Sequence, residues 1–274
     1  MTRSSLAALA SVSPHWVLVF GSVQHFIRPE LFALLREAFP EATLVGCSTA
    51  GEIGANCVTD GDMVITAVRF RPNMIRQSTT PFAGLEDSRA AGKRLAAGLS
   101  VPLHGEPLRH VLLFGPGVNV NGTALVDGLS RAVDASVVIT GGLAGDGGAF
   151  RKTWLLTDAG ISDSQIVAIG FYGDDLTIGH GSFGGWQLFG PARKVTRAQG
   201  SVLYALDGEP ALDVYSRYLG EYAAGLPASG LLFPLAIVGA DHAEVGLIRT
   251  ILGVIARSGR SSSPGRSRRA VSCR

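Results

Sequence analysis

The chain has few cysteines, and none of them lies in a pattern that binds zinc. The three cysteines of this 274-residue sequence are Cys47, Cys57 and Cys273. They are too few and too widely spaced for a disulfide framework, and no Cys-x-x-Cys pair is present to hold a metal. Because free thiols persist in a reducing compartment, the sequence predicts a cytoplasmic protein. It also predicts that the protein holds no metal and no other cofactor.

Long apolar segments are also missing. The run from 231 to 240 is interrupted by Pro234 and Gly239, whereas a membrane-spanning helix needs about 20 consecutive apolar residues. The apolar segment from 6 to 12 is at the lower length limit of a signal peptide, and a strand-like segment follows almost at once. We therefore expect no membrane helix and no membrane partner.

Charge is scarce and unevenly distributed. Only 17% of the residues are charged, and six arginines lie between residue 257 and the C-terminus. Without these six, the 24 lysines and arginines fall to 18, against 22 aspartates and glutamates. The body of the protein is thus slightly acidic and gives no electrostatic support for nucleic-acid binding. Only the basic tail could bind nucleic acid, and short tails of this kind are usually solvated.

The sequence does contain a large apolar fraction and a repeated pattern. Hydrophobic residues make up 46% of the chain, which predicts a sizeable buried core. The strand-like segment Val17–Gly21 (VLVFG) recurs 94 residues later as Val111–Gly115 (VLLFG). The same offset relates residues 44–52 to residues 138–146, and both segments end in Ala-Gly followed by an acid. Two matches at one offset indicate an internal duplication.

Each copy is expected to contain a helix and a further strand. Apolar residues recur at helical spacing from Leu31 to Phe39 and again from Leu125 to Val133. Strand-like segments follow at 63–70 and 166–172, and the second copy has an additional short one at 153–157. The repeated unit is therefore strand, helix, strand, strand, and mixed rather than purely parallel sheets are predicted.

Further helices are predicted after each copy, at 85–99 and at 209–219. Asn121 and Asp207 precede two of the predicted helices and have side chains that commonly cap a helix. Two such units can pack sheet on sheet with their helices outside. The predicted fold class is mixed α/β, with internally duplicated β-α-β-β units and layered sheets flanked by helices.

Several motifs now carry a resemblance to a known family. The segment Gly46–Ile53 (GCSTAGEI) resembles the signature of the FIST family of sensory domains, and Gly141–Asp146 (GGLAGD) resembles its second signature. Segment 206–212 resembles a later part of the same N-terminal module, and parts of 233–250 resemble the opening of the family's C-terminal module. The resemblance implies an intracellular ligand-sensing domain of signal transduction that binds small molecules such as amino acids and has no known catalytic activity.

The resemblance also implies a domain organisation. It places a sensing domain at 13–220, built of pseudo-repeats at about 17–70 and 111–172, and a partial C-terminal segment at 221–255. Residues 256–274 are rich in Arg, Ser and Gly, and we expect them to form a disordered basic tail. A frameshift would produce such a tail, and a genuine short variant is the alternative. If the C-terminal module is incomplete, the ligand site or the fold is also incomplete.

The two Ala-Gly-acid turns are the predicted ligand site. Small residues at a strand end leave main-chain N–H groups exposed, and such groups attract an anionic or carbonyl group. Ser48 and Thr49 add hydroxyl donors and acceptors, and Glu52 and Asp146 could hold an ammonium group. A site that binds both a carboxylate and an ammonium group is what an amino acid requires. The alternative is structural: glycine allows close packing, and Thr49 and Glu52 form a capping box. The residues predicted to contact a ligand are Gly46, Cys47, Ser48, Thr49, Gly51, Glu52, Gly141, Gly142, Gly145, Asp146 and His180.

Cys47 suggests an alternative function, a cysteine-dependent acyl transferase or hydrolase. Such an enzyme needs a nearby base and an oxyanion hole. The candidate bases are His25, His104, His110 and His180. None of them lies in a recognised cysteine-enzyme signature. The position equivalent to Cys47 in the second copy is Gly141, so the fold does not require a thiol there.

Three functions therefore remain open. The first is a non-enzymatic small-molecule sensor that reports to a separate signalling protein, because the chain has no kinase, cyclase or DNA-binding motif. The second is the Cys47-dependent enzyme, and the third is a scaffold that presents a surface to a protein partner. The glycine-rich segment 141–148 is only a weak candidate for a nucleotide loop, because it lacks the Lys-Ser/Thr of a P-loop.

Overall fold

The chain divides into two compact units, Met1–Gly181 and Ser182–Arg274. A computed structural model of the protein describes residues 3–71, 74–181, 186–239, 244–256 and 269–273. The predicted sensing domain, residues 13–220, extends past the first unit and includes part of the second.

The first unit contains two large β-sheets. The five-stranded sheet has the order β10 (Gly160–Ser162), β9 (Leu155–Thr157), β2 (Thr43–Thr49), β1 (Trp16–Ser22) and β5 (Met63–Val68). The four-stranded sheet has the order β6 (Ile75–Pro81), β11 (Gln165–Tyr172), β7 (Leu108–Gly115) and β8 (Val138–Leu143). A separate short hairpin consists of β3 (Glu52–Ile53) and β4 (Val58–Thr59).

The central strands of the two sheets have equivalent neighbours. Strand β1 pairs in parallel with β2 and antiparallel with β5, and β7 pairs in parallel with β8 and antiparallel with β11. The predicted mixed α/β class is thus confirmed, while the duplication itself stays a prediction. The two halves also exchange strands, because β9 follows β8 in the chain but pairs with β2, and β6 follows β5 but pairs with β11.

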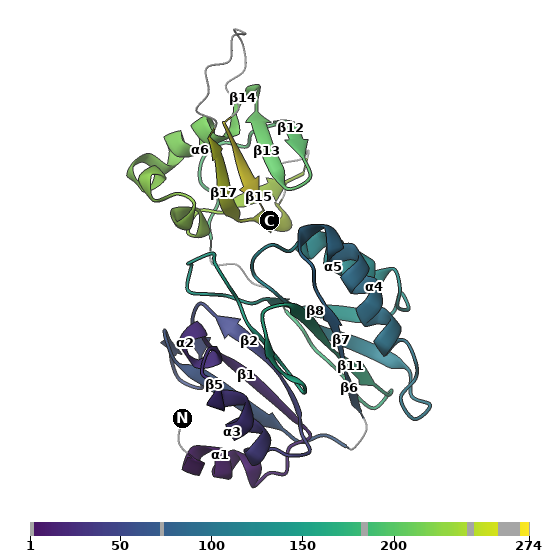
Figure 1. The fold of residues 1–274 in the computed structure, drawn as a ribbon. Coiled ribbons are helices and arrows are strands. Elements are labelled where there is room, and N and C mark those ends of the chain that lie inside the picture. Colours follow the sequence, from purple (N-terminus) through teal and green to yellow (C-terminus); the bar gives the residue numbers. More distant parts are fainter. Residues whose placement is uncertain (1–2, 72–73, 182–185, 240–243, 257–268, 274) are drawn as a thin grey trace. The chain divides into compact units, whose positions relative to one another are not determined.

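Helices cover the outer face of each sheet and give the first unit four layers (Figure 1). The five-stranded sheet is covered by α1 (Arg3–Ala10), α2 (Val23–Phe26) and α3 (Glu30–Ala38). The four-stranded sheet is covered by α4 (Ser88–Leu99), which follows the 3-10 turn η1 (Leu85–Asp87), and by α5 (Gly122–Ser130). One apolar cluster lies between each sheet and its helices, and a third lies between the two sheets.

Alternation of side chains along β1 shows why the central strands are apolar on both faces. Val17 and Val19 are fully buried toward the helices, whereas Trp16 packs between the sheets. Phe20 also faces the second sheet and packs edge-on against Phe114, with 5.5 Å between ring centroids. A strand buried on both sides reads as a continuous apolar run, which is the pattern that the sequence shows.

The helices between the paired strands are confirmed close to their predicted positions. At the start of α5 the predicted cap is present, because Asn121 Oδ1 accepts a hydrogen bond from Ala124 N at 3.0 Å. Helix α4 forms within the predicted segment 85–99, after the 3-10 turn. Within the described part of the chain, no helix combines the length and the apolar character that crossing a membrane requires.

The second unit is built around helix α6 (Ala211–Leu219), which confirms the helix predicted there. Its sheet has the order β12 (Val195–Gln199), β13 (Val202–Leu206), β18 (Arg269–Cys273) and β17 (Ile251–Ala256), with β14 (Glu209–Pro210) paired to β13. The remaining elements are the 3-10 turns η2 (Gly220–Gly225) and η3 (Ala228–Leu231) and the paired strands β15 (Leu235–Val238) and β16 (Glu244–Arg249). Asp207 does not cap α6; its carboxylate instead accepts a hydrogen bond from Lys194 N at 2.9 Å.

The tail that was expected to be disordered contains a strand. Residues Arg269–Cys273 form β18, which pairs with β17 and β13, and Val271 is fully buried. The prediction of disorder for 256–274 is therefore wrong for these five residues and for Ala256, the last residue of β17. Composition does not show the main-chain partners that two neighbouring strands offer to a polar segment. Residues 257–268 lie outside the described residues.

Two glycines set the spacing of the parallel strand pairs. A Cβ atom on Gly46 of β2 would lie 1.8 Å from the carbonyl oxygen of Val19 on β1. A Cβ atom on Gly141 of β8 would lie 1.9 Å from the carbonyl oxygen of Leu113 on β7. Both glycines are thus required by the close approach of a neighbouring main chain.

The pairing of these strands changes the residue of the second copy that is equivalent to Cys47. Cys47 pairs with Phe20 in the first sheet, and Gly142 pairs with Phe114 in the second. The position in β8 that corresponds to Cys47 is therefore Gly142, and the prediction of Gly141 is one residue out of register. A side chain at the Gly142 position would point between the sheets, as Cys47 does.

Alanine at position 46 or 141 should strongly destabilise the protein. Each added methyl group would overlap a carbonyl oxygen of the neighbouring strand, so the strands must separate, at an expected cost of about 3 kcal/mol or more. Urea unfolding curves of Gly46→Ala and Gly141→Ala would measure the loss. The matched control is Gly142→Ala, because no heavy atom of another segment lies within 4 Å of its added Cβ. An unfolding midpoint of Gly46→Ala close to that of the control would contradict the close approach.

Candidate functional site

Strands β2 and β8 end beside each other, and the turns that follow them form a glycine corner, residues 48–52 and 144–146. Gly145 N donates a hydrogen bond to Ser48 O at 2.7 Å. A Cβ atom on Gly145 would lie only 2.8 Å from Ala50 N. The two turns that carry most of the predicted site residues therefore lie in contact.

Ser48 links the parts of this corner. It is fully buried, and its hydroxyl donates to Gly145 O at 2.7 Å and accepts from Trp154 N at 3.0 Å. Its main-chain nitrogen also donates to Trp154 O at 2.9 Å. These partners are all internal, so Ser48 connects β2 to the segments that follow β8 and has no free face toward a ligand.

The carboxylate of Glu52 is an internal acceptor. The residue is 1% exposed, and its two oxygens accept hydrogen bonds from Thr49 Oγ1 at 2.5 Å and from Asp62 N at 3.0 Å. The predicted contact between Thr49 and Glu52 exists, but as a capping box it is wrong, because β3 rather than a helix follows. Glu52 thus holds the base of the β3–β4 hairpin.

The carboxylate of Asp146 closes the loop after the corner. One oxygen accepts from Phe150 N at 3.0 Å, and the other accepts from Arg151 N at 2.7 Å and from Lys152 N at 3.2 Å. Three main-chain donors therefore already satisfy this acid. Both acids that were predicted to hold an ammonium group serve to fold their own loops.

The position of Cys47 does not favour nucleophilic chemistry. Its side chain lies in the apolar cluster between the sheets, and burial raises the pKa of the thiol to about 12. The thiol is therefore protonated near neutral pH, whereas the reactive form of cysteine is the thiolate. Of the candidate bases, His25 Nε2 is bonded to Gly61 O at 3.0 Å, away from this thiol. Cys57 is exposed.

A polar pair lies on the inner face of the four-stranded sheet. His110 of β7 is 4% exposed, and its Nε2 lies 2.7 Å from Thr140 Oγ1 of β8. The ring of Phe171 packs edge-on against the imidazole, with 5.9 Å between centroids. Burial lowers the pKa of His110, and the nearby charge of His180 lowers it further. The imidazole is therefore neutral at physiological pH.

On the same face of β8, the next residue toward the glycine corner is Gly142, and the space above it is unfilled. Gly142 follows Thr140 at the strand period of two, so both lie on the face that carries His110. Gly142 is exposed, and no heavy atom of another segment lies within 4 Å of an added Cβ. In the other sheet the corresponding position is filled by Cys47. We call His110, Thr140 and Gly142 the polar strip.

The structure thus separates the predicted site residues into groups. Cys47, Ser48 and Glu52 are buried, and Gly46 and Gly141 space the strands. Gly142 remains open. His180 lies exposed on the loop after β11, and its charge contributes to the lowered pKa of His110. The described residues contain no cluster of three side chains that could hold a metal ion.

Sequence reasoning weighed His110 only as a base for Cys47 and missed Thr140. The available signal was a polar residue inside each of two otherwise apolar strands, HVLLF and VITGG. A buried polar side chain needs a partner, and here each provides the partner of the other. Their proximity could not be read from the sequence, because the two residues lie on different strands.

The comparisons with known proteins agree with the motifs. Residues 15–209 match the FIST N domain family, and this match covers more than half of the chain. The chain therefore belongs to the FIST N domain family, a family of sensory domains in signal transduction. An uncharacterized protein of Methanocaldococcus jannaschii is 25% identical over 207 residues, which cover 70% of this chain and 38% of that protein. The chain thus spans less than half the length of this curated relative.

Removing the Ser48 hydroxyl should loosen the glycine corner. Ser48→Ala leaves the partly buried Gly145 O and Trp154 N without this partner, and we expect a loss of about 2 kcal/mol in the free energy of unfolding. Urea unfolding measures this value. Ser130→Ala on the exposed surface of α5 is the control and should unfold as the native protein does. Equal stability of the two variants would show that the corner does not depend on this hydroxyl.

The stability of the first unit should fall as the pH is lowered from about 7 to about 5. The folded state lowers the pKa of His110 below its usual 6.5, so the unfolded chain binds the proton more strongly. The contribution is complete above the unfolded pKa and is lost as the pH falls toward the folded pKa. Unfolding curves across this range measure the slope.

In this pH series, His110→Gln should flatten the slope. The control is His104→Asn, which changes an exposed histidine of positive φ to a residue that tolerates that backbone conformation. It should keep the native slope. A native slope in His110→Gln would mean that another group causes the pH dependence.

Proposed function

We propose that this chain senses a small molecule that binds over the polar strip, beside the glycine corner. The open space above Gly142 carries the proposal, because the neighbouring positions of the inner face are filled by packed side chains. The family supports a sensory role. Buried His110 and its half-buried partner Thr140 supply a polar group at a place where packing alone would favour an apolar one.

The chemistry of this place suits a carbonyl or carboxylate group. Among the described strands, β8 pairs only with β7, so alternate main-chain N–H and C=O groups of β8 point outward. Gly141 and Gly142 carry no side chains of their own that could shield these groups. Such exposed main-chain donors bind anionic or carbonyl oxygens. An amino acid belongs to this class, although Glu52 and Asp146 are already engaged and would not hold its ammonium group.

A second candidate function, docking of a signalling partner, is favoured by the β3–β4 hairpin. Ile53 and Val58 form a cross-strand pair and are 79% and 72% exposed. Two large apolar side chains this exposed on one hairpin are typical of a protein contact. Because Glu52 belongs both to this hairpin and to the glycine corner, the hairpin connects the proposed ligand site to the proposed partner contact.

A thermal-shift screen of amino acids and related metabolites tests the sensor. A ligand present at about 100 times its dissociation constant stabilises the folded state by about 2.7 kcal/mol, which is easily measured. Gly142→Val should fold normally and abolish the shift, because the side chain fills the open space. His110→Gln should weaken binding, whereas the surface variant Ser130→Ala should not.

Two outcomes would overturn the sensor. One is the absence of any stabilising compound together with the copurification of a partner that Ile53→Asp releases, which would favour docking alone. The other is a stabilising compound that binds Gly142→Val as tightly as the native protein. A Cys47→Ala variant that loses a measurable turnover would instead restore the enzyme alternative.

A further inference from the structure

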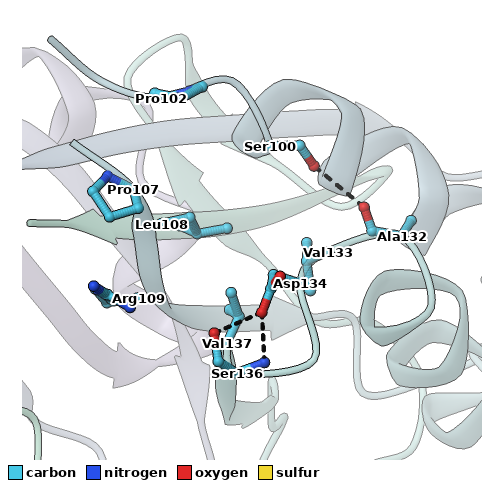
Figure 2. A pocket seen from close by; sticks show the side chains of 10 residues that line it. All are labelled: Ser100, Pro102, Pro107, Leu108, Arg109, Ala132, Val133, Asp134, Ser136 and Val137. Carbon is cyan, nitrogen blue, oxygen red and sulfur yellow. Dashed lines mark hydrogen bonds between the residues drawn. The ribbon is translucent and has the colours of Figure 1, made fainter. Parts of the chain in front are cut away.

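A groove on the first unit and a set of exposed aromatic residues on the second lie outside the site proposed above. The groove, of about 340 Å³, is formed by the end of α4, the start of β7 and the loop between α5 and β8 (Figure 2). Its carboxylate, Asp134, is exposed and accepts hydrogen bonds from Ser136 N at 2.8 Å and Ser136 Oγ at 2.6 Å. Beyond the end of α4, Arg76 donates to Val101 O at 2.7 Å. These polar groups are bonded or solvated, so they do not select a ligand.

The second unit carries large apolar side chains on its surface. Six residues that lie close together are each between 38% and 82% exposed. We call them the aromatic patch: Trp186, Phe189, Tyr218, Tyr222, Leu232 and Phe233. Single exposed apolar residues are common on a protein surface, whereas a continuous group of them marks a contact with another molecule.

Hydrogen bonds and ring contacts show that one side of the patch is continuous. Trp186 Nε1 donates to Leu232 O at 3.2 Å. The next residue, Phe233, packs against Tyr222 with 5.2 Å between ring centroids. The hydroxyl of Tyr215, on helix α6, donates to Phe233 O at 2.7 Å. The segment that carries Leu232 and Phe233 is therefore fixed on α6, with its apolar side chains still exposed.

The other side of the patch is held by an arginine. Phe189 packs edge-on against Tyr218 in the last turn of α6, with 6.3 Å between ring centroids. The guanidinium of Arg193 lies over the Tyr218 ring at 5.9 Å and donates to its hydroxyl at 2.9 Å. Arg193 also forms an ion pair with Asp207 at 3.2 Å. These contacts order the rings before any partner binds, which lowers the entropy that binding would cost.

The charges beside the patch are balanced. Besides Arg193, which is paired, Arg217 of α6 forms an ion pair with Glu209. Lys194 and Glu221 are both exposed and have opposite signs. The patch therefore has no surplus charge that would attract a strongly acidic or basic partner, or that would repel an identical surface.

The area of the patch matches what one subunit contributes to a stable dimer. A large aromatic side chain has about 150 to 250 Å² of surface to bury, so at these exposures the six residues present about 600 Å². Two copies would bury about 1,200 Å² from these residues alone, which is the lower bound of a standard specific interface. Interfaces between identical subunits are more apolar than other interfaces, and their centres are rich in aromatic residues.

We propose that the aromatic patch binds the same patch of a second copy of this chain across a two-fold axis. Aromatic rings pack favourably against other rings, so a surface made mainly of them is complementary to itself. A two-fold axis brings identical surfaces together and closes the assembly at two chains. The dimer goes beyond the sensory function proposed above and needs no ligand at the polar strip.

Sedimentation equilibrium of the full chain tests the dimer. We expect a mass of two chains, with a dissociation constant of about 1 µM or lower. Phe189→Asp and Leu232→Asp should each raise this constant at least about thirtyfold, because each places a charge in the apolar contact. The control is Val101→Asp, which adds the same charge at a 61% exposed position of the first unit and should leave the constant unchanged.

The fluorescence of Trp186 gives a second measurement. Its side chain is 53% exposed, whereas Trp16 is 7% exposed and lies in the core of the first unit. Dimer formation should bury Trp186, so its emission should move to shorter wavelength as the protein is concentrated through the dissociation constant. Trp186→Phe keeps an aromatic ring and should still dimerise, but this shift should be absent.

A native chain that sediments as a monomer at about 100 µM refutes the dimer. A dimer that persists in both Phe189→Asp and Leu232→Asp also refutes it, because another surface would then join the two copies. Larger aggregates without a defined dimer would show a surface that binds without specificity, which contradicts a closed two-fold contact. If one aspartate variant does not fold, the other decides the question. All these measurements use the protein without ligand, so they stand whether or not the sensor is confirmed.

Discussion

The hydrogen bonds of one buried serine connect the two halves of the first unit. Ser48 ends the inner strand of the five-stranded sheet and binds Gly145, which follows the edge strand of the other sheet, and Trp154, which precedes β9. This contact needs small residues on both sides, because the two main chains approach within the space of a single Cβ. Gly145 of the second family signature is explained by this geometry, and Gly46 and Gly141 by the spacing of the parallel strands, before any ligand is considered.

The same constraint determines where a ligand can bind. Residues that hold the corner together, such as Glu52 and Asp146, use their carboxylates for the chain's own main-chain and hydroxyl donors. What remains open is the neighbouring face of β8, where Gly142 leaves a space that Cys47 fills in the other sheet. Small differences between two similarly arranged sheets therefore distinguish a packed position from an accessible one. The His110–Thr140 pair, of which His110 is buried, places neutral polar atoms beside that space.

The sequence by itself determined the local elements. The apolar runs predicted β1 and β7, the helical spacing predicted α3 and α5, and the Asn121 cap was read correctly, because each depends only on residues close in the chain. The family motifs also identified the two turns that meet. Only the tertiary structure decided the register of Gly142 opposite Phe114, the exchange of β6 and β9 between sheets, and the pairing of β18 in a tail that composition marks as disordered. It also showed that Glu52 and Asp146 are engaged internally, and that His110 and Thr140 are partners. These facts depend on which distant segments supply hydrogen-bond partners and fill space, and neither is encoded in a residue's immediate neighbours.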